Sequence, residues 1–185
     1  MLLYQIVSFL LNAIVSIVGG ACLVRLAMQR QRVPFSNPVG RLVMALTDWI
    51  VLRLRKVVPS VAGWDTSSLL AAYLLVVTKL LLLWVVLGAS ASMALIPLVA
   101  LFGLAQLAIS VFTALMIVYA VLSWVQPQSP VMPVIDRLCA PLLNPLRRAL
   151  PQVGGFDFSP LVLLLILQVA GMLIGALQAQ VMGML

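Results

Sequence analysis

The chain alternates long uncharged segments with shorter segments in which nearly all of the charged residues gather. Residues 2–24 carry no charge, residues 67–124 carry only Lys79, and residues 159–185 carry none. Each residue adds ~1.5 Å to a helix, so about 20 apolar residues cross the hydrocarbon core of a bilayer. The first and last segments therefore predict one transmembrane helix each, and the middle segment predicts two helices.

A turn is expected near the middle of the second segment. Small residues at 88–92, followed by Pro97, supply the turn and the helix breaker. The first span is interpreted as a retained helix rather than a cleavable signal peptide, because no Lys or Arg precedes it. The expected fold class is an all-α membrane protein with four transmembrane helices.

The composition agrees with a membrane protein and narrows the chemistry. Of the 185 residues, 64% are apolar and 8% are charged, which excludes an ordinary soluble domain. There is no His and no Glu, and the four acids are all Asp, so little is available for acid–base work near neutral pH. Cys22 and Cys139 have neither CxxC spacing nor a neighbouring His. We therefore expect a protein that is not an enzyme, with no cofactor and no metal site.

The basic residues indicate an orientation. Ten of the eleven lie between spans one and two or between spans three and four, whereas the other loop and both termini carry none. By the positive-inside rule those two segments are cytoplasmic and both termini are extracytoplasmic. The net charge of +7 is thereby explained without nucleic acid as a partner. The ten residues are Arg25, Arg30, Arg32, Arg41, Arg53, Arg55, Lys56, Arg137, Arg147 and Arg148.

The chain contains an internal duplication. A shift of 92 residues aligns the two basic segments without a gap. Pro38 then aligns with Pro130, Arg55 with Arg147, Lys56 with Arg148, Asp65 with Asp157 and Ser67 with Ser159. Residues 1–90 and 91–185 are predicted to form two repeats, each a helix, a basic interfacial segment, a Gly-x-Asp-x-Ser motif and a second helix. Since each repeat has two spans, an axis along the membrane normal should relate the copies.

The most specific motif is Pro-Leu-Arg-Arg at 145–148, followed by Pro151 and Gly-Gly-Phe-Asp-Phe-Ser-Pro at 154–160. With its weaker copy in the first half, including Arg25, Asp65 and Lys79, this pattern resembles the YggT family, called YlmG in some bacteria and plastids. The resemblance implies a multi-pass protein of the bacterial inner membrane. It also implies a link to osmotic tolerance and cation uptake, or to division and assembly of membrane complexes in plastid relatives.

The motif residues suggest both structural and binding roles. Asp65 and Asp157 precede apolar spans, so each is expected to cap a helix N-terminus after a turn at Gly63 or at Gly154 and Gly155. Basic side chains beside apolar surface favour anionic lipid headgroups. A second interpretation is that these side chains only set the topology. The candidate headgroup contacts are Arg55, Lys56, Arg147 and Arg148.

The two basic segments are expected to differ in regularity. In the first, Leu42, Val43, Leu46, Trp49 and Ile50 recur at helical spacing, which predicts an interfacial helix lying in the membrane plane. In the second, three prolines predict two short helices or a broken helix. These are Pro133, Pro141 and Pro145.

Polar residues inside the spans are expected mainly at helix contacts. They comprise Ser8, Asn12 and Ser16 in the first span, Gln106 and Ser110 in the third, and a GxxxG at Gly171 and Gly175 in the fourth. Lys79 lies 14 residues beyond Asp65, about 21 Å into its span. Two interpretations of Lys79 remain, namely snorkelling to the outer interface and a functional polar site.

Together these features favour a non-catalytic scaffold or accessory protein whose partners are anionic lipids and either another membrane protein or a second copy of the chain. One alternative is a small cation channel or transporter subunit. A further alternative is an assembly or cell-division factor for membrane complexes.

Overall fold

A computed structural model describes residues 2–58, 64–86, 93–126, 128–149 and 157–183. The chain forms α-helices joined in two places by short helical turns of other types. The elements are α1 (Leu2–Ile14), the π-helical turn η1 (Val15–Gly19), α2 (Gly20–Arg30), α3 (Pro38–Arg55), α4 (Thr66–Val86), the 3-10 turn η2 (Met93–Leu95), α5 (Ile96–Val125), α6 (Met132–Ala149) and α7 (Ser159–Gly183).

Four helical stretches are long and apolar enough to cross a membrane, which confirms the all-α, four-helix expectation. They are Leu2–Arg30, Thr66–Val86, Met93–Val125 and Ser159–Val181. The first is longer than predicted, because α2 continues past residue 24 and includes Arg25. The predicted turn at 88–92 lies outside the described residues, and Pro97 belongs to the first turn of α5. Proline is tolerated there because the first helical N–H groups have no partner within the helix.

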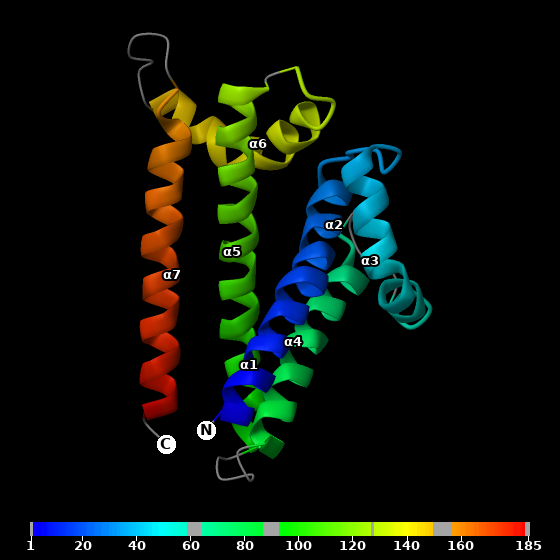
Figure 1. Ribbon diagram of the computed structural model, residues 1–185, viewed down its shortest axis with the longest axis vertical. Coiled ribbons are helices and arrows are strands. Elements are labelled where there is room, and N and C mark those ends of the chain that lie inside the picture. The colour runs from blue at the N-terminus through cyan, green and yellow to red at the C-terminus, as the bar shows by residue number, and fades with distance from the viewer. Residues whose placement is uncertain (1, 59–63, 87–92, 127, 150–156, 184–185) are drawn as a thin grey trace.

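The spanning helices run along the long axis of the molecule, and the chain termini lie together at one end (Figure 1). At the other end α6 lies across α5 and α7, and α3 lies beside α2 and α4. We call this the basic end, because the ten basic residues other than Lys79 lie on α2, α3 and α6 or directly after α2 and α3. Each half has the same pattern of contacts: α3 packs on α2 and α4, and α6 packs on α5 and α7. The order of helix, interfacial helix and helix thus occurs twice. The halves meet mainly through α4 and α5.

The largest hydrophobic cluster lies at the basic end, where α2, α5 and α6 meet. Its fully buried members include Met28, Met116, Leu138 and Leu143. A smaller cluster, which includes Val76 and Leu107, holds η1, α4 and α5 together. Many apolar side chains of α1 and α7 stay exposed, as expected for helices that face lipid.

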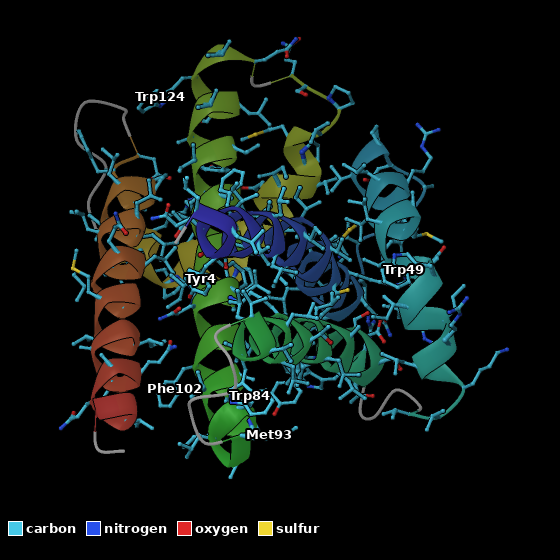
Figure 2. The ribbon with its side chains drawn as sticks, turned by 60° about the horizontal axis from the view of Figure 1, so that its bottom comes forward. Tyr4, Trp49, Trp84, Met93, Phe102 and Trp124 are labelled. Carbon is cyan, nitrogen blue, oxygen red and sulfur yellow. The ribbon has the colours of Figure 1, made fainter. Side chains whose placement is uncertain are left out.

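Aromatic side chains gather near both ends of the molecule. Trp124 lies near the end of α5 and Trp84 near the end of α4, on opposite sides of the view in Figure 2, while Trp49 belongs to α3 and Tyr4 to the first turn of α1. Trp124 is 69% exposed. Tyr and Trp prefer the two membrane–water interfaces, where the ring is partly in hydrocarbon and the polar atom is wet. The aromatic residues therefore mark the two boundaries of the apolar layer.

The second interfacial segment is one bent helix, so the prediction of two short helices is wrong. Arg147 and Asp136 lie eleven residues apart on it, about 16 Å in a straight helix, and still approach to 3.6 Å, which requires a bend between them. One helix, α6, runs from Met132 to Ala149 and contains Pro141 and Pro145 in its interior. These two prolines are four residues apart and both are exposed, so the hydrogen bonds that they remove lie on the outer side of the helix. The inner side packs Leu138 and Leu143 into the core and keeps the helix continuous.

The first interfacial segment is helical as predicted, and the face that it buries against the bundle lies beside the predicted apolar stripe and shares Val43 with it. The buried residues of α3 are Gly40, Val43, Thr47 and Val51. Leu42 and Trp49 instead point outward and are exposed. The helix thus has one face against the bundle and an apolar edge turned away from it. Thr47 is buried because its hydroxyl is hydrogen-bonded on both sides.

We expect both chain termini to face the extracytoplasmic side, because the basic residues gather at the opposite end of the bundle. Alkaline phosphatase fused after residue 185 should be active, and green fluorescent protein fused after Gln128 should fluoresce. Fluorescence from a C-terminal fusion would contradict this orientation.

Candidate functional site

Charged side chains of the first half meet at the basic end, where α2, α3 and α4 come together. Arg25 of α2 is only 4% exposed. Its Nη1 donates to Asp48 Oδ1 at 2.6 Å and to Thr47 Oγ1 at 2.7 Å. Its Nε lies 3.8 Å from Asp65 Oδ2. A buried guanidinium is thus satisfied by two carboxylates and a hydroxyl, as burial of a charge requires.

Asp65 is the most buried acid of this group, with no exposed surface. Its Oδ2 accepts from Arg55 Nη2 at 2.8 Å and from Ser68 Oγ at 2.6 Å, and its Oδ1 lies 3.4 Å from the Ser68 amide. Asp65 directly precedes α4, so one carboxylate faces the helix N-terminus and also pairs with α3. We call Arg25, Asp48, Arg55 and Asp65 the first charge cluster.

The second half contains a related group, centred on Arg147 of α6. Arg147 Nε donates to Asp157 Oδ2 at 2.9 Å, and Nη1 lies 3.6 Å from Asp136 Oδ1. Nη2 of Arg147 donates to the Tyr119 hydroxyl of α5. We call Tyr119, Asp136, Arg147 and Asp157 the second charge cluster. It ties the end of α5 and the start of α7 to α6.

Asp157 lies two residues before α7, one position upstream of the cap site. Its Oδ1 accepts from the Ser159 amide at 2.9 Å. Although burial opposes ionisation, the hydrogen bonds from Ser159 and Arg147 outweigh it and hold the pKa of Asp157 below its usual value. The side chain is 32% exposed, so the second cluster is wetter than the first.

The two clusters share one duplicated interaction. Arg55 pairs with Asp65 and Arg147 pairs with Asp157, each across ten residues of sequence. The remaining members differ, because Arg25 and Asp48 have no charged counterparts 92 residues further on. Each pair fixes an interfacial helix to the start of the following span.

Sequence analysis missed Arg25, Asp48 and Tyr119 as partners in these clusters. The sequence places Arg25 after the first uncharged segment and gives no indication that Asp48 is its partner. The available signal was one Arg within an apolar helix and one Asp on a helix otherwise rich in Arg. The predicted turn glycines Gly63, Gly154 and Gly155 lie outside the described residues.

The four candidate headgroup contacts fall into two classes. Arg55 and Arg147 are committed to Asp65 and Asp157. Lys56 and Arg148 are exposed and, within the described residues, form no ion pair. Of the four candidates, the second residue of each basic pair is therefore the one left available for contacts outside the chain.

Lys79 reaches across to the first span. Its Nζ donates to Asn12 Oδ1 at 3.1 Å, and Asn12 Nδ2 donates to Ser8 Oγ at 3.4 Å. The lysine thus ends a polar row that runs along α1. The hydrogen bond between Lys79 and Asn12 joins α4 to α1.

A groove of about 490 Å³ opens between α5 and α7 within the apolar layer. Its lining includes the polar side chains Gln106, Ser110, Thr113 and Gln168, together with Gly171. A Cβ at Gly175 would lie 3.7 Å from Gln106 Nε2, so the glycine brings α7 close to α5 beside the groove.

Comparison with known proteins gives a consistent result along the chain. The family model described as CCB3/YggT matches residues 4–86 and again residues 98–178. The chain belongs to this family. It is 36% identical to "Uncharacterized protein YggT" of Escherichia coli over 170 residues, which are 89% of this chain and 87% of the relative.

A second relative within the YggT family comes from Vibrio alginolyticus and is named "Uncharacterized protein in proC 3'region". It is 32% identical over 171 residues, 91% of this chain and 92% of the relative. No solved structure matches this YggT-family chain. The names of these relatives state no activity, so the function must be argued from the residues.

The residues that could bind a metal are dispersed in this YggT-family chain. Within its described residues, no three His, Cys, Asp or Glu side chains come together as a metal site. Cys22 and Cys139 are both buried and free. Burial, reinforced by the charge of Asp136, raises the pKa of Cys139 to about 12, so this thiol stays protonated.

The two duplicated aspartates should respond differently to removal of their charge. Asp65→Asn retains a capping side chain but leaves Arg25 and Arg55 short of a buried counter-charge, so it should cost about 3 kcal/mol of unfolding free energy. Asp157→Asn, in the wetter cluster, should cost about 1 kcal/mol. Both changes in unfolding free energy are measured by titrating the protein, solubilised in a mild detergent, with a denaturing detergent.

Ser68→Ala, which removes one hydroxyl donor to Asp65 and leaves every charge in place, is the matched control. Equal losses of unfolding free energy for Asp65→Asn and Asp157→Asn would show that the charge of Asp65 contributes no more to stability than that of Asp157.

Proposed function

We propose that this YggT-family protein is a non-catalytic scaffold of the bacterial inner membrane. It organises membrane partners, binds anionic lipids at its basic end, and so supports osmotic tolerance or cation homeostasis indirectly. One observation carries the proposal: all four aspartates are paired with arginines. Asp48, Asp65 and Asp157 join different helices or helix ends in this way, and Asp136 pairs with Arg147 within α6.

This pairing argues against catalysis. A general acid or base needs a pKa near the working pH and access to a substrate. The chain has no His or Glu, Asp65 is buried against two arginines, and the pKa of Asp157 is shifted away from neutrality. None of these groups is suited to transfer a proton at pH 7.

The same pairing argues against conduction of cations by this chain alone. Transporters usually bind their substrate near the bilayer midplane. Here every acid lies at or before the basic end of a span, and Lys79, the single charge well within the apolar layer, repels cations. The groove between α5 and α7 offers amides and hydroxyls without a carboxylate.

The exposed basic side chains support lipid binding. Lys56 follows Arg55, which pairs with Asp65, and Arg148 follows Arg147, which pairs with Asp157. The paired arginines hold their helix ends at the membrane surface and leave the second basic residue outward. Each such charge near an anionic surface contributes about 1 kcal/mol.

Purified protein in liposomes should give no potassium or sodium flux above that of empty vesicles, because the spans contain no acid that could bind a cation. Vesicles containing gramicidin provide the positive control. A selective flux that depends on protein concentration would replace the scaffold proposal with the channel alternative.

Lys56→Gln combined with Arg148→Gln should reduce the phosphatidylglycerol retained by the purified protein at least twofold, with unchanged thermal stability, because neither side chain holds the fold. Lipid extracted from the protein and quantified by mass spectrometry measures this.

Arg41→Gln combined with Arg137→Gln is the matched control for a loss of two charges. An equal loss in the control would show that lipid responds only to net charge.

A further inference from the structure

Lys79 is a charge within the apolar layer that the fold does not fully compensate. It is half-buried on α4, seven residues before Val86, which places its Cα about 10 Å from the end of that helix. Trp84, one of the aromatic residues near that end, lies five residues further along (Figure 2). The lysine therefore belongs to the half of the layer away from the basic end.

The hydrogen bonds of Lys79 are incomplete. An ammonium group has three donors, and within the described residues one acceptor is present, Asn12 Oδ1 at 3.1 Å. Asn12 in turn donates to Ser8, which fixes the carbonyl end of its amide towards the lysine. Buried charges are retained when they are paired, because an unpaired ion in hydrocarbon costs several kcal/mol.

The surface around Lys79 is suited to a helix. Figures 1 and 2 both show α1 alongside α4, and the two helices are in contact. Asn12 is exposed, and Phe9 on α1 and Leu82 on α4 are exposed apolar side chains on the same pair of helices. A third helix laid along α1 and α4 would cover this apolar surface and the ammonium together.

The aspartates of a second copy in the same orientation cannot supply the missing counter-charge. Its aspartates stand at 48, 65, 136 and 157, all at or before the basic end of a span, and it has no Glu. Two copies inserted in the same orientation therefore bring no aspartate to the depth of Lys79. An acidic side chain at the depth of Lys79 would therefore belong to a different protein.

We propose that the α1–α4 face binds a transmembrane helix of another protein that carries Asp or Glu in the half of the bilayer away from the basic end, and that this carboxylate pairs with Lys79. The proposal rests on the scaffold function and names the class of partner. The carboxylate accepts from Nζ, Asn12 holds the ammonium in place, and the exposed apolar side chains of α1 and α4 pack against the partner helix.

The test measures fluorescence energy transfer between the full chain, labelled with a donor dye, and a synthetic Leu/Ala transmembrane peptide labelled with an acceptor dye. Both are placed in phosphatidylcholine vesicles at pH 8. One peptide has Glu about 10 Å from the end that matches the free end of α4. A second peptide has Gln at that position. The Glu peptide should associate about tenfold more tightly by energy transfer, and Lys79→Met should remove this difference.

Two further variants keep the result specific. The charge exchange, Lys79→Glu with a peptide carrying Lys at the same depth, should restore the tenfold preference. A peptide with its Glu moved two turns towards the basic end should bind no better than the Gln peptide. If Lys79→Met fails to fold, as judged by helical circular dichroism, the comparisons between peptides on the unmodified chain still decide.

Equal binding of the Glu and Gln peptides to the unmodified chain would overturn the proposal. Loss of the preference when phosphatidylglycerol is added would also overturn it, because a lipid phosphate would then be the partner of Lys79. Neither result would affect the liposome flux assay, which tests the scaffold function separately.

Discussion

The fold depends on the burial of a carboxylate at the start of a transmembrane helix. Asp65 is fully buried before α4, and an unpaired buried charge would cost several kcal/mol. Arg55 at the end of α3 and Arg25 of α2 therefore have to meet it, which brings α2, α3 and α4 together at one point. The interfacial helix is thus held by an ion pair in addition to its apolar contacts.

The duplication repeats this interaction in a different environment. Arg147 pairs with Asp157 as Arg55 pairs with Asp65, but Tyr119 stands near Arg147 where the first half has a second arginine near Asp65. One half thus neutralises two aspartates with two arginines, and the other shares one arginine between two aspartates. Since Asp157 is partly exposed, water can compensate for the missing cation there. The same motif gives a dry junction in one half and a wetter one in the other.

Hydropathy and charge predicted the four spans, because both are properties of consecutive residues and the bilayer restricts the spanning structures to helices. The internal duplication could also be detected, because it too is a pattern in the order of residues along the chain. The sequence did not reveal the pairing of Arg25 with Asp48, since that contact joins helices 23 residues apart and depends on how α3 turns against α2. The prolines of α6 correctly indicated an irregularity, since the helix bends between Asp136 and Arg147. That the helix continues through the bend was missed, because it depends on the packing of Leu138 and Leu143.

The distribution of charge separates two kinds of surface. At the basic end every aspartate is paired with an arginine, and the second basic residue of each pair stays exposed. In the opposite half of the apolar layer the balance is reversed, because Lys79 has an amide and no acid within this chain. The proposed lipid contacts and the proposed pairing with a carboxylate therefore use different residues. Lys56 and Arg148 lie at the basic end, and Lys79 lies in the other half of the apolar layer, so the two proposed interactions can be made by the chain at the same time.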